Sequence, residues 1–132
     1  MVGGGELIYP ELSYKITGIL FTAHNEVGPY AREKQACDVI ERLLQESKIK
    51  HRRECRVGDS GNITDFIIDN KIVLEAKSKR VLTRNDYEQI QRYLQETQLK
   101  LGILVNFRNQ YLKPIRIVKI DTQFKNNFIK GN

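Results

Sequence analysis

The stretch "ITDFIIDNKIVLEAKS" (residues 63–78) decides the fold, because its pattern is typical of a β-hairpin. Two apolar runs flank a polar turn, "DNK", at residues 69–71. Charged residues interrupt both runs: Asp65 the first run, and Glu75 and Lys77 the second. A loop at 69–71 places Asp65 opposite Glu75 with Cβ atoms about 4.5–5.5 Å apart, where like charges destabilise a hairpin. Two carboxylates at these positions therefore need an interaction that offsets their repulsion.

A positive charge between the two carboxylates would offset this repulsion. The candidates are Lys77 and a hard divalent cation such as Mg²⁺, which prefers oxygen ligands. A cation held there lowers the pKa of a bound water and stabilises charge on a phosphate oxygen, and a neighbouring lysine can assist. Strand alternation predicts that Asp65 shares a face with Ile63 and Ile67. An ordinary ion pair on a solvated hairpin face stays open as the alternative.

The remaining periodic segments predict an α/β fold with one sheet. Apolar spacing of three and four residues predicts helices over 11–27, 31–47 and 83–97, and runs of strand formers predict strands over 51–57, 62–68, 72–78, 101–107 and 115–120. The order is therefore α-α-β-β-β-α-β-β, with helices packed on a sheet. The nearly continuous apolar run at 101–107 indicates a strand covered on both faces, whereas 51–57 and 115–120 are expected nearer the edges.

Local signals mark the ends of two helices. Gly28 and Pro29 terminate the first helix, and Thr83 with Asp86 three residues later has capping-box spacing for the third. The expected core face of that third helix is formed by three apolar residues, Tyr87, Ile90 and Leu94.

Glu33 is the unusual residue of the second helix. It precedes Cys37 by four residues and Ile40 by seven, which places it on the inward face. A buried carboxylate needs a cation or a hydrogen-bond donor, so the sequence predicts a partner for it. The alternative is a glutamate at a helix N-terminus, where the helix macrodipole favours an acid.

Composition indicates one globular domain. The 132 residues are 40% hydrophobic and 29% charged, and the net charge of +6 is consistent with a polyanionic partner, with a solvated basic surface open as the alternative. We expect a lead-in at 1–10, a domain at 11–121 and a tail at 122–132. Two cysteines are too few for a disulfide framework; they are expected to be reduced thiols of a cytoplasmic protein, with a single bridge between them as the open alternative. Neither a signal peptide nor a membrane-spanning run is present, so no membrane partner is expected.

The order of elements and the charged hairpin resemble the PD-(D/E)XK nuclease superfamily, whose core is αβββαβ. Thr64-Asp65 matches the "PD" element without its proline, and Glu75-Ala76-Lys77 matches "(D/E)XK". The resemblance implies a restriction-endonuclease-like fold, with a metal ion held by Asp65, Glu75 and the carbonyl of Ala76. It further implies that Lys77 acts on the attacking water and the phosphate, and that Glu33 contacts the metal or the water.

Within that superfamily the chain looks like the bacterial GxxExxY proteins over about residues 11–120. The segments that carry this likeness are "ITGILFTAHNEVGP" (16–29), the charged hairpin, "EQIQRYLQ" (88–95) and "LKLGILVNF" (99–107). Glu33 matches the acid of the name motif, while Tyr30 and Ala36 replace its glycine and tyrosine. "QIQRY" (89–93) also resembles the Q-x-x-x-Y motif of RecB-like exonucleases. This implies that Gln89 lies at the active site and that Tyr93 contacts DNA, with core packing as the alternative for Tyr93.

The expected function is hydrolysis of phosphodiester bonds by a Mg²⁺-dependent nuclease, with Mn²⁺ able to substitute and with DNA preferred over RNA. Backbone phosphates are expected on basic residues near the hairpin, namely Arg52, Arg53, Lys79, Arg80 and Arg84. Two alternatives stay open: a non-catalytic nucleic-acid-binding module on the same fold, and a structure-selective nuclease of the junction-resolvase kind, which would act as a homodimer.

Overall fold

The computed structural model describes residues 8–121. Its elements are α1 (Pro10–Val27), α2 (Glu33–Glu46), β1 (His51–Val57), β2 (Asn62–Ile68), β3 (Ile72–Lys77), α3 (Arg84–Thr97), β4 (Leu101–Asn106) and β5 (Ile115–Val118). The type and order of every expected element are confirmed. The expected tail at 122–132 and most of the lead-in lie outside the described residues. Ile8 is described, and its carbonyl accepts a hydrogen bond from Arg116 of β5 at 2.7 Å, so it is part of the folded unit.

The five strands form one sheet in the order β1-β2-β3-β4-β5. Only β3 and β4 pair in parallel, because α3 carries the chain back between them; the other neighbours are antiparallel. The register of the β2–β3 hairpin is the expected one, with Phe66 opposite Leu74 and Ile68 opposite Ile72. Both edge strands, β1 and β5, were predicted as such.

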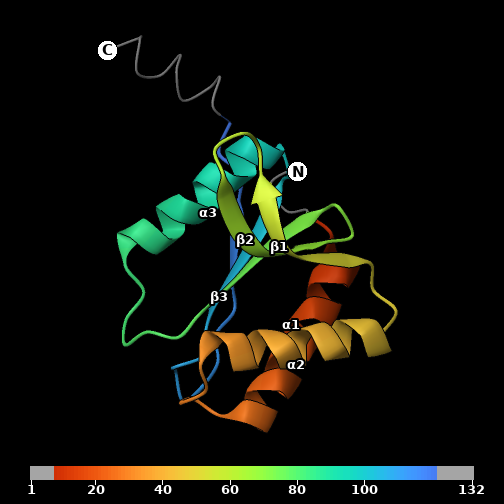
Figure 1. Ribbon diagram of the computed structural model, residues 1–132, viewed down its shortest axis with the longest axis vertical. Coiled ribbons are helices and arrows are strands. Elements are labelled where there is room, and N and C mark those ends of the chain that lie inside the picture. Colours follow the sequence, from red (N-terminus) through yellow and green to blue (C-terminus); the bar gives the residue numbers. More distant parts are fainter. Residues whose placement is uncertain (1–7, 122–132) are drawn as a thin grey trace, which may run out of the picture.

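The helices cover the two faces of this sheet, as Figure 1 shows. α1 and α2 pack on one face over a large apolar cluster that includes Phe66 and Leu74. α3 packs on the opposite face over a smaller cluster that includes Val73 and Ile90. β4 lies between the two clusters and is buried along its whole length, which confirms the expectation from its apolar run. The site described below therefore rests on strands that are covered on both faces.

The start of α3 confirms the acidic part of the predicted capping box. The Thr83 N–H donates to Asp86 Oδ2 at 2.7 Å. The predicted core face of α3 is corrected at one position, since Tyr87 is exposed and Tyr93 is buried beside Ile90 and Leu94. The helix is rotated so that the stripe toward the sheet follows residues 86, 90, 93 and 94.

Candidate active site

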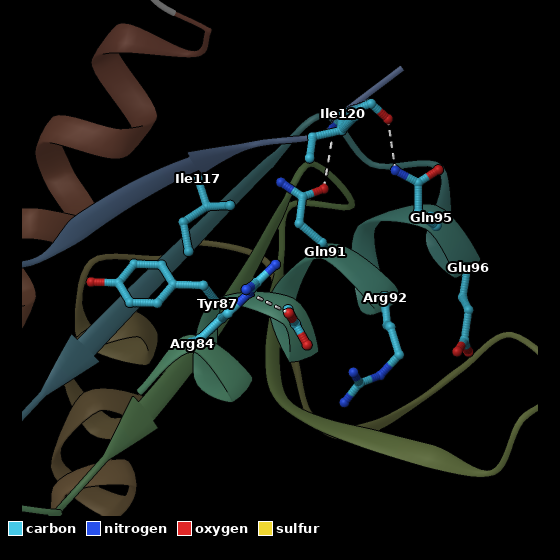
Figure 2. Close-up of a pocket in the computed structure, with 9 residues that line it drawn as sticks. Arg84, Tyr87, Gln91, Arg92, Gln95, Glu96, Ile117 and Ile120 are labelled. Carbon is cyan, nitrogen blue, oxygen red and sulfur yellow. Dashed lines mark hydrogen bonds and ion pairs between the residues drawn. The ribbon is translucent and has the colours of Figure 1, made fainter. Parts of the chain in front are cut away.

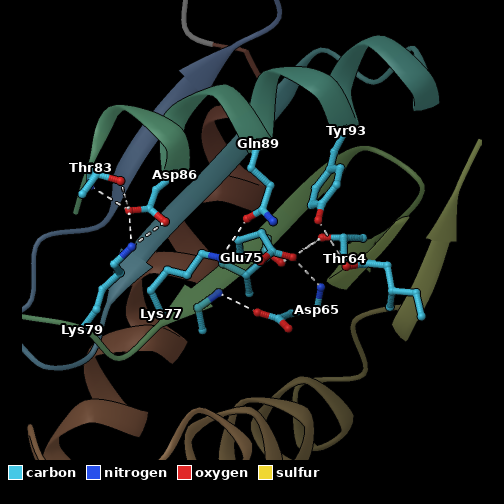
Figure 3. A network of polar contacts seen from close by, with 12 residues as sticks. Thr64, Asp65, Glu75, Lys77, Lys79, Thr83, Asp86, Gln89 and Tyr93 are labelled. Atoms are coloured by element: carbon cyan, nitrogen blue, oxygen red, sulfur yellow. Dashed lines mark hydrogen bonds and ion pairs between the residues drawn. The ribbon is translucent and has the colours of Figure 1, made fainter. Parts of the chain in front are cut away.

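Asp65 and Glu75 lie where β2 and β3 stop pairing through their backbones. The ladder ends at the pair Phe66–Leu74, and side chains take over beyond it. The Asp65 N–H donates to Glu75 Oε1 at 2.7 Å, and the Ala76 N–H donates to Asp65 Oδ2 at 2.8 Å (Figure 3). Each carboxylate thus accepts a hydrogen bond from the backbone of the opposite strand, which fixes the orientation of both side chains.

Thr64 adds a third contact to this pair. Its hydroxyl donates to Glu75 Oε1 at 2.8 Å, and both residues are buried. Oε1 of Glu75 is therefore fully occupied by the protein, and Oε2 is the oxygen left for other partners. The threonine that stands next to Asp65 in the motif consequently positions Glu75.

The predicted face of Asp65 is wrong. Ile67 packs beneath α3, whereas the charge of Asp65 reaches Cys37 of α2 on the other face, where burial first and that charge second raise the pKa of the thiol to about 12. Figure 3 also draws the Asp65 carboxylate on the α2 side of the hairpin. The interruption lies where Glu54 of β1, which has a positive φ of 53°, faces Asp65 of β2: these two residues are the position of the β1–β2 ladder that does not pair.

That interruption changes which face the side chains of β1 use. Arg53 reaches Asp38 of α2 at 2.7 Å, yet Cys55, two residues further on, packs in the cluster beneath α3. Regular alternation would place both on one face. The β1–β2 pair therefore changes faces at the level of Asp65, while its register stays the same on both sides of the interruption.

The two carboxylates hold more negative charge than the site neutralises. Glu75 is only 5% exposed, and burial, followed by the charge of Asp65, raises its pKa to about 7. Burial also raises the pKa of Asp65; the bond from the Ala76 N–H works in the opposite direction, and the charge of Glu33 adds to the increase. A cation bound here would relieve this repulsion.

Lys77 is the nearest cation to Glu75, and α3 holds it in place. Its Nζ donates to Oε1 of Gln89 at 2.7 Å and lies 3.6 Å from Oε2 of Glu75 (Figure 3). Gln89 projects from α3 toward the end of β3, as predicted for a residue near the site. Since the closer contact of the ammonium is with a neutral amide, Lys77 only partly compensates Glu75.

The side chain of Glu33 has a different orientation from the one predicted. The side chain is exposed, and within residues 8–121 it forms no hydrogen bond and no ion pair, so the expected inward orientation is wrong. The reason is that α2 begins at Glu33 itself, with Arg32 as N-cap, so this residue lies at the open end of the helix. It still lies near the site, because its charge contributes to the raised pKa of Asp65.

Tyr93 packs in the core. It is 4% exposed, and its hydroxyl lies 3.4 Å from the carbonyl of Ile63, to which it donates. Its ring has no surface left for a nucleic acid, so the expected contact with DNA is not supported and the packing alternative describes the residue. The helical rotation that exposes Tyr87 buries Tyr93.

The predicted phosphate-binding residues divide into two groups. Arg53 contacts Asp38 and Glu41, and Lys79 contacts Asp86 at 2.9 Å, so these two cations are held by acids of the protein itself. The other three are exposed, namely Arg52, Arg80 and Arg84, and Arg84 pairs with Glu88 along the surface of α3. Sequence alone does not separate these groups, because it does not say which acids lie nearby.

Arg84 lines a groove between α3 and β5, and neither Asp65 nor Glu75 lines this groove. The groove has a volume of about 730 Å³ and is lined by residues that include Arg84, Tyr87 and Ile117 (Figure 2). Gln91 and Gln95 of α3 reach across it to Ile120, with the Gln95 amide donating to the Ile120 carbonyl at 2.7 Å. None of the predicted catalytic residues lines this groove.

Asn106 is a contributor that the sequence interpretation missed. At the end of β4, its amide donates to the Lys79 carbonyl at 2.7 Å and its Oδ1 accepts from the Lys79 N–H at 3.1 Å. The segment that follows Lys77 is therefore clamped to β4. The available signal was a single polar residue at the end of the otherwise apolar run "LGILVNF".

The donor set fits a hard divalent cation with few protein ligands. Asp65 Oδ1 has no hydrogen-bond partner among the described residues, and Glu75 Oε2 faces only Lys77. Within residues 8–121, no cluster of three or more His, Cys, Asp or Glu side chains is arranged to hold a metal. Oxygen donors in small number suit Mg²⁺, which keeps several of its waters when bound to proteins.

Comparison with known proteins agrees with this geometry. The family model of the PD-(D/E)XK nuclease superfamily matches residues 10–118, which include the hairpin and all three helices. Neither curated proteins nor solved structures gave a match. Members of this superfamily are nucleases that typically use divalent metal ions, and the mixed five-stranded sheet with helices on both faces is consistent with their fold. The chain belongs to the PD-(D/E)XK nuclease superfamily.

Proposed function

We propose that this protein is a Mg²⁺-dependent nuclease that hydrolyses phosphodiester bonds of DNA in preference to RNA, with Mn²⁺ able to substitute. The observation that carries the proposal is the pair of a half-buried Asp65 and a buried Glu75, whose side chains are fixed by backbone hydrogen bonds and whose pKa values are raised, beside a lysine held by an amide. Perturbed carboxylates of this kind gather at functional sites, because function outweighs their cost to stability.

Each residue of the site has a role in this proposal. Asp65, Glu75 and the Ala76 carbonyl would hold the ion, which supplies a water of lowered pKa and neutralises charge on a phosphate oxygen. Lys77 would orient the attacking water and stabilise the negative charge of the transition state. Gln89 would keep the ammonium of Lys77 at the end of β3.

Two further residue groups complete the proposed site. Glu33, exposed at the start of α2, would contact a water of the ion or accept its proton. Arg52, Arg80 and Arg84 would bind backbone phosphates, which gives an affinity that falls with salt concentration and depends little on sequence. Arg53 and Lys79 are left out of this set, because acids of the protein bind them in partly buried contacts. Arg84 is kept, because its pair with Glu88 lies in solvent, where a phosphate can replace the carboxylate.

The finer assignments are also proposals. Glu33 and the segments at 16–29 and 99–107 support membership of the GxxExxY proteins. Cys37 and Cys55 are both free and buried, in clusters on opposite faces of the sheet, which supports a reducing, cytoplasmic location. Among residues 8–121 no helix has the length and apolarity needed to cross a membrane.

The test is a cleavage assay with purified protein, Mg²⁺ or Mn²⁺, and three DNA substrates: linear duplex, single strand and a four-way junction. Asp65→Ala and Lys77→Ala are compared with Asp59→Ala, which removes an exposed carboxylate from the β1–β2 turn. We expect cleavage by the wild type and by Asp59→Ala, and a loss of at least about a hundredfold in the other two.

Three outcomes contradict the proposal in different ways. Equal cleavage by all variants would show that these carboxylates do not carry the reaction. Metal-independent DNA binding without any cleavage would favour the non-catalytic module. Cleavage confined to the four-way junction, by a protein that is dimeric in solution, would favour the resolvase alternative.

A further inference from the structure

Three connections that are far apart in sequence meet at one end of the sheet. The Ser78 hydroxyl donates to the Ala31 carbonyl at 3.1 Å, which joins the segment after β3 to the α1–α2 connection. His24 near the end of α1 donates through Nε2 to the Asn109 carbonyl at 2.8 Å, which joins α1 to the loop after β4. In Figure 1 the blue loop after β4 lies beside the orange α1–α2 connection.

Tyr30 stands at this junction with its ring in solvent. The residue is 81% exposed, and the guanidinium carbon of Arg108 lies 5.1 Å from the centroid of its ring. The neighbouring Ala31 is buried and held by Ser78, which directly follows Lys77. The position of this exposed ring is therefore tied to the strand end that carries the proposed catalytic lysine.

Cations without acidic partners lie over the ring, as Arg108 does, and on the two chain segments joined beside it, which carry Arg32 and Arg80. Arg32 and Arg80 are exposed, as is Arg108, and none of the three belongs to an ion pair of the described residues. Arg53 and Lys79, by contrast, are bound by acids. Exposed arginines beside an exposed aromatic ring combine phosphate binding with a surface on which a base can stack.

We propose that Tyr30 and Arg108 form a stacking platform for an unpaired nucleobase, so that the preferred substrate is single-stranded DNA or a frayed end rather than intact duplex. This inference rests on the proposed function, since it names the substrate class of the same site. Bases inside a duplex already stack on their neighbours and offer no free face, whereas a single strand offers each base to an aromatic ring.

The platform is tested by binding measurements without divalent metal, in which no metal-dependent cleavage occurs. Fluorescence anisotropy gives the Kd of a labelled single-stranded oligonucleotide and of the matched duplex for each variant. Tyr30→Ala and Tyr30→Phe are compared with Tyr14→Ala, because Tyr14 lies on α1 and is also 81% exposed. A 2-aminopurine base in the single strand reports stacking through quenching of its fluorescence.

We expect Tyr30→Ala to weaken single-strand binding by roughly tenfold, about the loss of one base–aromatic stack, and to reduce the 2-aminopurine quenching. Duplex affinity should change less than about twofold, and Tyr30→Phe and Tyr14→Ala should bind like the wild type, since stacking needs the ring and not the hydroxyl. An unchanged single-strand affinity in Tyr30→Ala, or an equal loss for both substrates, overturns the platform.

Failure of the platform and failure of the nuclease proposal are distinguishable. Tyr30-dependent binding of single strands by a protein that cleaves nothing supports the platform and contradicts the nuclease. Cleavage that depends on Asp65, together with an unchanged single-strand Kd in Tyr30→Ala, supports the nuclease and contradicts the platform. Absence of both binding and cleavage in the wild type contradicts both proposals.

Discussion

Asp65 and Glu75 hold each other's strands: the Asp65 N–H donates to Glu75 Oε1, and the Asp65 carboxylate accepts from the N–H of Ala76, the residue after Glu75. The bonds are 2.7 and 2.8 Å long and replace the backbone ladder, which ends at the adjacent pair Phe66–Leu74. The side chains of two acids thus connect β2 and β3 by hydrogen bonds, although their negative charges repel each other.

Glu75→Gln should stabilise the fold in alkaline buffer. Burial and the charge of Asp65 raise the pKa of Glu75 to about 7 in the folded protein, above its ordinary value of 4.5, so the native state retains a proton that the unfolded state loses. This contribution to stability is complete below about pH 4.5 and is lost as the pH rises through about 7. Thermal denaturation in EDTA should therefore give a Tm several degrees above wild type at pH 8, with the difference vanishing near pH 4.

Glu11→Gln is the control for that measurement, since it neutralises an exposed acid at the start of α1. Its Tm should follow the wild type across the pH range. A lower Tm for Glu75→Gln at pH 8 would mean that ionised Glu75 is adequately compensated, and would remove the electrostatic argument for a cation.

Mg²⁺ should raise the Tm of the wild type at pH 8, because a ligand that binds only the folded state stabilises it by mass action. Asp65→Ala should lose the increase, whereas Asp59→Ala should keep it. Differential scanning calorimetry over a Mg²⁺ series gives the effect without any cleavage assay. The same increase in Asp65→Ala would place the ion elsewhere.

Gln89→Ala should lower kcat by about tenfold or more and leave KM little changed, because Gln89 positions Lys77 and does not bind DNA in the proposed mechanism. Gln91→Ala is the matched control, since Gln91 bonds to Val118 and Ile120 on the other side of α3. Steady-state kinetics on single-stranded DNA separates the two constants. A rise in KM at constant kcat would make Gln89 a substrate-binding residue.

Asp86→Ala should destabilise the protein by roughly 1–3 kcal/mol, since it removes the buried carboxylate that accepts hydrogen bonds from the Thr83 N–H and from Lys79. Burial alone would raise the pKa of Asp86, but bonds from Thr83 and Lys79 outweigh it and hold the pKa below its usual value. The contribution is thus present above the ordinary carboxyl pKa and is lost as the pH falls through the lowered one. Urea denaturation at pH 7 tests it against Glu88→Ala, an exposed ion-pair partner whose removal should cost less than about 0.5 kcal/mol.

Gly102→Ala should destabilise the packing of α3 on the sheet. A Cβ at this position would lie 2.6 Å from Cγ2 of Ile90, so the helix must shift, at a cost of about 1–3 kcal/mol. Gly18→Ala is the opposite control: nothing lies within 4 Å of its Cβ position, and alanine favours the helix by about 0.5–1 kcal/mol. Because Ile90 follows Gln89, cleavage should fall in the first variant only. Equal stability of both variants would contradict the close packing.

The elements and their order followed from local patterns alone. Apolar spacing gave every helix and strand to within two residues, and the turn at 69–71 gave the register of the hairpin. The acidic cap of α3 at Asp86 was also visible in the sequence. These features depend on interactions between residues that are close along the chain or face each other across one turn, so periodicity and turn chemistry are sufficient to predict them.

The environment of each site residue was decided only by the tertiary structure. Asp65 lies on the α2 side of the hairpin, at the unpaired position opposite Glu54, and the start of α2 at Glu33 put that acid in solvent. The rotation of α3 buried Tyr93 and exposed Tyr87. In each case the outcome depends on which segments, distant in sequence, pack against one another. The sequence by itself determined which charges the hairpin carries; the packing of α2 and α3 on its two faces decided what those charges meet, because burial and charge–charge distance exist only once the chain is folded.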